Sequence, residues 1–206
     1  MKDDKIEVDN SEVASEKSEA KKKSKKAVIW DWVKTLAIPI IIAILILQVI
    51  RPTLVQQQSM MPNVQPNNYL IVNKLAYAFG GEPEFGDIIV FKSALQDGNG
   101  NGKYLIKRVV ATEGQSIQIT NGRVYIDGQE INEPYLHGIE TPGDVLPSVV
   151  PEDSIFVMGD NRANSTDSRD PMVGFVSNDT IMGKVVLRLF PFNEIGGLYS
   201  GELAIK

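Results

Sequence analysis

The 206-residue sequence contains no cysteine, and this absence excludes several kinds of chemistry at once. Disulfide bonds, thiolate metal sites and a cysteine nucleophile all require that residue, so none of them can operate in this chain. Cysteine usage therefore says nothing about the compartment in which the protein folds. That information has to come from other segments of the sequence.

Histidine is almost absent as well, since His137 is the only one in the chain. A Ser-His-Asp triad would therefore have to use His137 as its base. This residue lies in the segment Glu-Pro-Tyr-Leu-His-Gly, which is typical of a loop and has no nearby carboxylate pattern that would orient an imidazole. We interpret His137 as an exposed loop residue, and any serine hydrolase activity would need another base.

The sequence after residue 68 also lacks a basic stripe interleaved with aromatic residues. The net charge of −5 averages over a basic run near the N-terminus and a more acidic remainder. Because nucleic-acid-binding proteins carry a clustered positive footprint, the sequence gives no support to a nucleic-acid partner.

One long apolar run is present, over residues 35–50, and only Thr35 and Gln48 interrupt it. A helix of this length is slightly short for a hydrocarbon core of about 30 Å, so we expect the anchor to extend over residues 27–55. Apolar residues on every face favour a membrane anchor over a helix buried in a soluble core. A cleavable secretory signal is the main alternative, but residues 48–53 offer no small-x-small cleavage site.

The charges on either side of this run predict its orientation. Only Arg51 follows it within the next twenty residues. The lysines that closely precede it are Lys17, Lys21, Lys22, Lys23, Lys25, Lys26 and Lys34. The positive-inside rule then places the N-terminus in the cytoplasm, and the lysine run can also bind anionic lipid of the bilayer. We predict a disordered cytoplasmic tail over residues 1–26, the membrane anchor, and an extracytoplasmic domain over residues 56–206.

The remainder of the chain has the pattern of a mainly β domain with an antiparallel sheet. Asn121-Gly122 separates two alternating segments, residues 116–120 and 123–126, and this predicts a hairpin with a type I′ turn. Asp127-Gly128 follows at once, which indicates that the meander continues. Further strands are expected near residues 87–92, 104–111, 154–158 and 181–189.

The segment from Gln96 to Gly102 imitates two ligand-binding motifs. As a calcium loop it would need a bidentate glutamate at its twelfth position, where Arg108 stands. As a phosphate loop it lacks the Gly-Lys-Ser/Thr ending on a helix. We interpret it as a flexible loop between two strands, and the sequence predicts neither a metal ion nor a cofactor.

Three segments together indicate a catalyst. They read Ser59-Met-Met-Pro62, then Lys107-Arg-Val109, then Gly-Asp-Asn-Arg-Ala-Asn-Ser-Thr-Asp-Ser-Arg over residues 159–169. Each segment is ordinary by itself, and the third could be a turn held by its own hydrogen bonds. In this order, after an N-terminal anchor, they resemble the boxes of the type I signal peptidases of Gram-positive type, over about residues 27–195.

This resemblance implies a membrane-bound serine endopeptidase with a β-sheet catalytic domain. Such enzymes remove signal peptides from exported preproteins, cutting after small residues at the −3 and −1 sites. It implies that Ser59 is the nucleophile and that Lys107 is the general base. It further implies that Ser165 hydrogen-bonds to the lysine, and that Asp167 and Arg169 pair to hold the third segment.

A lysine can act as a base only when it is neutral, which its ordinary pKa forbids at pH 7. Burial disfavours the ammonium form and lowers that pKa, and the apolar neighbours Leu105, Ile106 and Val109 could provide such burial. A cation at Arg108 or Arg169 would lower it further.

Two features of the site stay open at this stage. The family often has a small residue or a hydroxyl at position 57, where this chain has Gln57; the Ser59 N–H should remain one oxyanion donor, and the Gln57 amide is a candidate for another. The candidates for the lining of the substrate pocket are Val55, Met60, Leu105 and Ile106.

Two other functions can be compared with this one. A Ser/Lys self-cleaving regulator of the repressor type would be soluble, and the apolar run argues against it. A non-enzymatic homologue serving pilus or secretion assembly as a binding partner would typically lose the serine or the lysine, and this chain keeps both. A specialised enzyme with a restricted set of substrates, such as pilins, stays open as an alternative. Preprotein signal peptides are the expected partners, and the secretion translocon is a further candidate.

Overall fold

The computed structural model describes residues 25–98, 100–198 and 204–205. The chain divides into two units between Leu45 and Ile46, and each is considered by itself. The tail predicted for residues 1–26 lies outside the described residues, apart from the first two residues of the helix.

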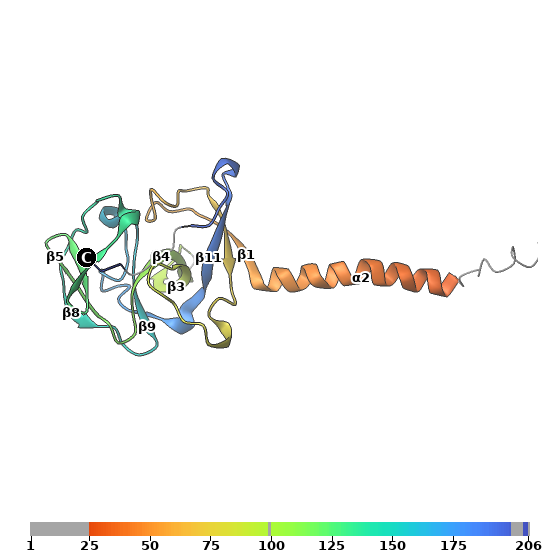
Figure 1. The fold of residues 1–206 in the computed structure, drawn as a ribbon, viewed down its shortest axis with the longest axis horizontal. Coiled ribbons are helices and arrows are strands. Elements are labelled where there is room, and N and C mark those ends of the chain that lie inside the picture. Colours follow the sequence, from red (N-terminus) through yellow and green to blue (C-terminus); the bar gives the residue numbers. More distant parts are fainter. Residues whose placement is uncertain (1–24, 99, 199–203, 206) are drawn as a thin grey trace, which may run out of the picture. The chain divides into compact units, whose positions relative to one another are not determined.

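The described residues of the N-terminal unit all belong to one helix, α2 (Lys25–Val49), which continues four residues past the unit boundary and is shown in orange in Figure 1. The stretch Trp32–Val49 is long and apolar enough to cross a membrane, and none of it is buried within the protein. The prediction of one apolar N-terminal helix is therefore confirmed, but the helix ends at Val49 and does not reach Val55. Pro52 explains this end, because it disfavours the helical conformation at the preceding Arg51 and donates no backbone hydrogen bond.

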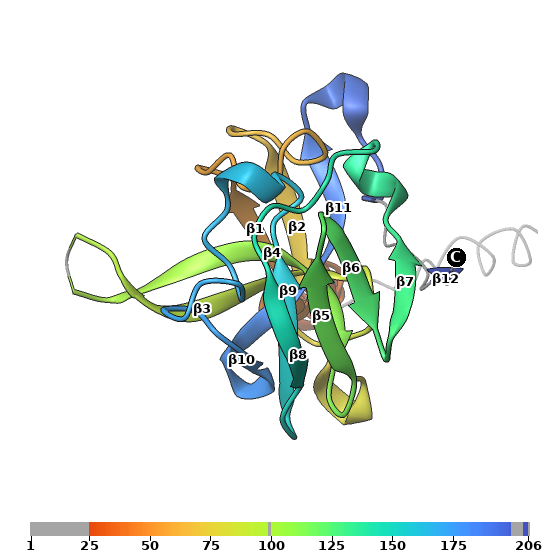
Figure 2. The same cartoon turned by 90° about the vertical axis from the view of Figure 1, so that its left-hand side faces the viewer.

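The second unit is built from antiparallel strands, which confirms the predicted fold class (Figure 2). One sheet has seven strands in the order β1 (Ile50–Leu54), β2 (Tyr69–Asn73), β11 (Ile181–Phe190), β3 (Ile88–Gln96), β4 (Gly102–Thr112), β9 (Ser154–Met158) and β10 (Val176–Ser177). The other has five in the order β12 (Ala204–Ile205), β7 (Gln129–Asn132), β6 (Arg123–Ile126), β5 (Ser116–Thr120) and β8 (Val145–Val149). Single turns of 3₁₀ helix occur at η1 (Ala78–Gly80), η2 (Pro134–Leu136), η3 (Arg162–Asn164), η4 (Asn178–Thr180) and η5 (Phe192–Glu194).

The predicted hairpin is formed by β5 and β6, with Thr120 opposite Arg123. Asn121 and Gly122 both have positive φ, 50° and 74°, as a type I′ turn requires. The meander continues through Asp127-Gly128 into β7, as expected. The sequence did not predict strands β1, β2, β8, β10 and β12.

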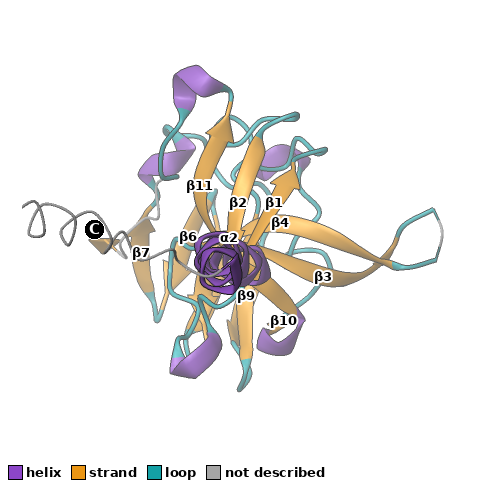
Figure 3. Cartoon of the chain, turned by 90° about the vertical axis from the view of Figure 1, so that its right-hand side faces the viewer, coloured by secondary structure: helices purple, strands orange, loops and turns teal. Residues whose placement is uncertain are grey.

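The order of the large sheet separates the hairpin β1–β2 from the hairpin β3–β4. Strand β11, which comes late in the chain, lies between them and pairs with both β2 and β3. The β3–β4 hairpin projects from the rest of the domain (Figure 3), and the segment from Gln96 to Gly102 lies at its tip. The prediction of a loop between two strands is thus confirmed for its described residues.

Both faces of the large sheet are buried near its centre. Along β3, Ile88 and Val90 join one apolar cluster, while Ile89 and Phe91 join another on the opposite face. This alternation follows from the two-residue period of a strand, and burial on both faces explains the continuous apolar run in β3.

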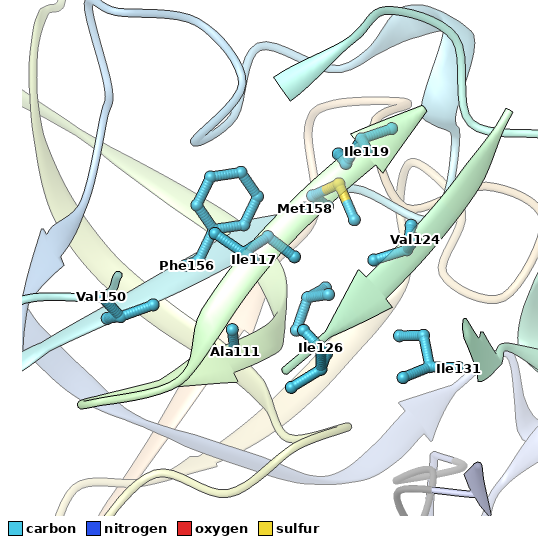
Figure 4. Packing of buried hydrophobic residues seen from close by; sticks show 10 residues of the cluster. Ala111, Ile117, Ile119, Val124, Ile126, Ile131, Val150, Phe156 and Met158 are labelled. Atoms are coloured by element: carbon cyan, nitrogen blue, oxygen red, sulfur yellow. The ribbon is translucent and has the colours of Figure 1, made fainter. Parts of the chain in front are cut away.

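A third cluster links the two sheets (Figure 4). Ile117 and Ile119 of β5 and Ile126 of β6 pack with Phe156 and Met158 of β9. At about 25 cal/mol per Å² of buried apolar surface, such a cluster stabilises the join between the sheets by several kcal/mol. It also fixes the end of β9, from which the third sequence segment starts.

Candidate active site

Ser59 lies in a tight turn that follows β1. The turn is closed by the N–H of Met61, which donates to the carbonyl of Gln58 at 3.1 Å, and the N–H of Val64 donates to the carbonyl of Met60 at 2.8 Å. The Met60 and Val64 side chains are buried in the cluster that includes Leu70 and Val72 of β2. The apolar residues after the serine thus anchor the turn and hold Ser59 in place.

Lys107 lies in the middle of β4, opposite Ile89 of β3. Its side chain is 1% exposed, which is exceptional for a lysine. Nζ of Lys107 lies 2.5 Å from Oγ of Ser59, within hydrogen-bond distance. The fold therefore brings the two residues together from separate hairpins of the sheet.

The surroundings of Lys107 favour its neutral form. Burial is the largest cause and lowers the pKa of Lys107 to about 8, from an ordinary value of 10.5. The carboxylates of Asp167 and Asp160 oppose this shift, whereas the cations of Arg169 and Lys103 add to it. Arg108, which we expected to contribute, instead pairs with Asp160. A substantial fraction of the amine is then neutral near pH 8.

The third segment, residues 159–169, packs directly against the serine turn. The backbone N–H of Asn161 donates to the carbonyl of Ser59 at 3.0 Å, and Nδ2 of Asn161 donates to the carbonyl of Gln58 at 3.1 Å. A Cβ on Gly159 would lie 2.4 Å from the Ser59 carbonyl oxygen and 2.2 Å from Oγ of Ser165. Only glycine allows this approach, which explains that residue of the motif.

Asp167 and Arg169 form an ion pair that closes the same segment. Nε of Arg169 donates to Oδ1 of Asp167 at 2.8 Å, and the Gly159 N–H donates to Oδ2 at 2.9 Å. Burial alone would raise the pKa of Asp167, but the hydrogen bond and charge of Arg169 outweigh it and hold this pKa below its ordinary value. Arg169 also donates to the carbonyls of Pro142 and Arg162, so one guanidinium ties three parts of the chain together.

A groove of about 690 Å³ runs from Ser59 over β1 and the outer part of β4. Val55, Met60 and Ile106, three of the four candidates for the substrate pocket, line this groove, and Gln57 reaches it as well. The prediction for Leu105 is wrong. Successive side chains of a strand point to opposite faces, so Leu105 packs against Phe91 and Val157 on the other face of the sheet.

Comparisons with known proteins show the family to which the chain belongs. A sequence model of the family described as signal peptidase, peptidase S26, matches residues 29–190. The chain belongs to this family.

Individual relatives agree with the family match. A signal peptidase I from Bacillus amyloliquefaciens is 34% identical over 189 residues, which cover 87% of this chain and 97% of the relative. A probable signal peptidase I-1 from Synechocystis is 39% identical over 181 residues, covering 83% and 89%. The crystal structure of a signal peptidase I from Enterococcus faecalis aligns at 30% identity with a TM-score of 0.42, covering 50% of this chain and 96% of that one. The family match and the two sequence relatives show that the chain is a hydrolase of the signal peptidase I type.

In this signal peptidase Ser165 does not make the contact that the resemblance implied. Its buried Oγ makes no hydrogen bond to Lys107 among the described residues; it lies beside Asp167 and helps to lower the pKa of that carboxyl. Oγ of Ser165 instead fills the space where a side chain at position 159 would begin. The Lys107 amine is held instead by its hydrogen bond with Oγ of Ser59.

Two buried ion pairs support the site and were not anticipated. Arg108 donates to Asp160 through Nε at 2.8 Å and through Nη2 at 2.7 Å, and its guanidinium lies 4.1 Å from the centre of the Tyr135 ring. Arg162 pairs with Glu133 of the segment after β7. Both arginines lie inside the sequence motifs, but their partners come from distant segments, so the motifs alone did not reveal the pairs.

His137 is placed as the sequence predicted. It is exposed and adopts a left-handed conformation, φ 53°, at the end of η2. Its side chain makes no hydrogen bond or ion pair in the described part of the chain. Across the described residues there is also no group of three or more His, Cys, Asp or Glu that could hold a metal ion.

Proposed function

We propose that this peptidase removes signal peptides from exported preproteins, with Ser59 as nucleophile and Lys107 as general base. The observation that carries the proposal is the 2.5 Å separation of Oγ and Nζ, at a lysine whose burial lowers its pKa to about 8. A buried lysine beside a serine hydroxyl has the protonation and the reach that proton abstraction needs.

The chemistry divides into two steps on this geometry. Neutral Lys107 takes the Ser59 hydroxyl proton as Oγ attacks the scissile carbonyl carbon, and the resulting ammonium protonates the leaving amine. An acyl-enzyme ester remains, and a water that gives its proton to Lys107 then hydrolyses it. We assign the Ser59 backbone N–H as one donor to the oxyanion, and Gln57, on the edge of the groove, is a candidate for the second.

The groove supports a specificity for small residues at the −3 and −1 sites. Val55 and Met60 are buried against the core, and Ile106 is partly buried beside them. A wall held this firmly leaves little room beside Ser59, so large side chains next to the scissile bond would be disfavoured. We assign Asp167 and Arg169 to holding the third segment against the serine turn.

The apolar helix supports a place in the cell membrane. Trp32–Val49 is a candidate span, and the excess of lysine before it favours a cytoplasmic N-terminus with the β domain on the outer side. We propose that the substrates reach the enzyme as they leave the bilayer, and that contact with the secretion translocon could deliver them.

The test is incubation of the detergent-solubilised protein with a preprotein, followed by N-terminal sequencing of the product. Cleavage after a small residue, abolished by Ser59→Ala, is the expected result. An intact preprotein in the presence of folded enzyme would favour the non-enzymatic alternative of a binding partner in pilus or secretion assembly. Cleavage of only a few among many preproteins would indicate a specialised enzyme.

A further inference from the structure

Asn161 holds both peptide groups that flank the nucleophile. Its backbone N–H donates to the carbonyl of Ser59, and its side-chain Nδ2 donates to the carbonyl of Gln58. The side chain of Asn161 is therefore linked to one particular peptide group, the one between Gln58 and Ser59.

That peptide group contains the proposed oxyanion donor. The Gln58 carbonyl and the Ser59 N–H belong to one planar trans unit, so they point in opposite directions. A hydrogen bond that fixes the carbonyl on one side therefore fixes the direction of the N–H on the other. The Met61 N–H also donates to this carbonyl, at 3.1 Å, and a carbonyl oxygen has two lone pairs to accept two donors.

The two donors act in different ways. The Met61 N–H belongs to the same turn and moves with it, whereas Asn161 comes from a segment anchored by the end of β9 and by the Asp167–Arg169 pair. The buried Met60 and Val64 anchor the turn after Ser59, but Gln58 before it is exposed, so the core does not hold the Gln58–Ser59 peptide from that side. The Asn161 amide attaches it to the rigid part of the domain.

We propose that Asn161 is a positioning residue, which aims the Ser59 N–H at the oxyanion of the acylation step. This inference rests on the proposed function. As the bond between Ser59 Oγ and the carbonyl carbon forms, the π electrons move to the carbonyl oxygen and the serine proton passes to Lys107. The Ser59 N–H donates to that oxygen, and Asn161 keeps it pointing there without touching substrate.

The size of the effect can be estimated from oxyanion holes in general. Removing one donor altogether lowers kcat by about 10²–10³-fold, and a donor that is only misaligned retains part of its value. Asn161→Ala should therefore lower kcat by about 10- to 100-fold with KM nearly unchanged. The acid limb of the pH profile should stay where it is in the parent enzyme, because Lys107 is not affected.

The experiment uses the full-length, detergent-solubilised protein with three variants. Asn161→Ala removes the amide, and Asn161→Asp keeps its shape but replaces the donor with an oxygen that repels the Gln58 carbonyl. Asn132→Ala is the matched control, since it removes the same group at an exposed position of β7 that contacts neither Asn161 nor the peptides of the nucleophile. Each is measured for kcat and KM on a peptide substrate.

Two inhibitors separate positioning from general damage. A substrate-like peptide aldehyde forms a hemiacetal with Ser59, whose oxygen occupies the oxyanion position, whereas the same peptide ending in an alcohol does not. Both Asn161 variants should weaken the aldehyde by about the factor lost in kcat and leave the alcohol within twofold. The ratio of the two inhibition constants is unaffected by any unfolded fraction, so a destabilised variant remains informative.

Three outcomes decide the matter. The inference is overturned if Asn161→Ala keeps full kcat, or if it weakens aldehyde and alcohol equally. It is also overturned if Asn132→Ala lowers kcat as much as Asn161→Ala. If the parent enzyme itself fails to bind the aldehyde better than the alcohol, the proposed serine mechanism fails, which is a different result.

Discussion

Nζ of Lys107 and Oγ of Ser59 lie 2.5 Å apart although 48 residues separate them in the chain. Lys107 is buried and Ser59 lies at the floor of the groove with only 9% of its surface exposed, so the contact is largely shielded from solvent. Once Lys107 has lost its proton, its amine can accept the hydroxyl proton of Ser59, which already lies within hydrogen-bond distance.

Removal of either partner should abolish peptide cleavage without unfolding the domain. Ser59→Ala and Lys107→Ala are each expected to lower kcat by at least about 10³-fold, and the double variant should be little worse, because the two residues act as a unit. His137→Ala, the control, should change the rate less than about threefold, since this side chain is exposed and makes no contact with the pair. Appreciable activity in Lys107→Ala would require a different base.

The rate should depend on the protonation of Lys107. Because burial lowers its pKa to about 8, kcat/KM is expected to rise with pH up to about 8 and to level off above it. The measurement is a pH profile on a peptide that does not titrate in this range. This rise of kcat/KM with pH should persist in His137→Ala. A rise centred at about pH 6.5 that disappears in His137→Ala would contradict the Ser/Lys mechanism.

The same lowered pKa should appear in the stability of the fold. Between about 8 and 10.5 the unfolded lysine binds its proton more readily than the folded one, so the free energy of unfolding rises with pH across this window and is lowest below it. Relative to Lys107→Met, the wild-type protein should gain about 2–3 kcal/mol between pH 7 and pH 10. Denaturant titrations of both proteins test this, because other titrating groups cancel in the difference. A constant difference would show that Lys107 has an ordinary pKa.

Arg169→Ala should destabilise the domain strongly. Asp167 is fully buried, and removal of its partner leaves a carboxylate without its cation, at a cost of about 3–5 kcal/mol. Arg123→Ala is the matched control, because Arg123 pairs with Glu130 while 48% exposed and should cost less than about 1 kcal/mol. Melting curves that fall equally for the two variants would argue against a structural role for the buried pair.

Neighbouring residues of β4 should behave in opposite ways when shortened. Ile106→Ala widens the groove and should raise the relative kcat/KM for a substrate with a larger residue next to the cut by about tenfold or more. Leu105→Ala leaves a cavity on the other face and should lower stability by about 2–5 kcal/mol with substrate preference unchanged. If Leu105→Ala changed substrate preference and Ile106→Ala did not, the substrate would have to bind on the face of the sheet opposite to the groove.

The hairpin at Asn121-Gly122 and the long strands β3, β4, β9 and β11 could be predicted because their signals are local. The end of the helix was misjudged because Leu54 and Val55 continue its apolar character. A local signal was available, since Pro52 restricts Arg51 to extended conformations. The pairing of β1 with β2 then uses these apolar residues in a sheet.

The residues of the catalytic pair could be named from the sequence only through the family motifs, since nothing in their spacing brings Ser59 near Lys107. The contacts around Ser59 and Lys107 could not be predicted from the sequence for the same reason. Asp160 meets Arg108 because β4 and β9 pair with Arg108 opposite Met158, and such a register is set by the packing of both faces. The missing bond of Ser165 likewise depends on ångström-scale distances that no motif encodes.

Strand order has a consequence for the synthesis of this enzyme. Ser59 follows β1 and Lys107 lies in β4, but the hairpins that carry them are joined in the sheet by β11, which begins at Ile181. A chain still growing on the ribosome holds both catalytic residues long before it holds the strand that brings them together. On the proposed mechanism, the nascent chain is expected to gain proteolytic activity only after β11 has been synthesised.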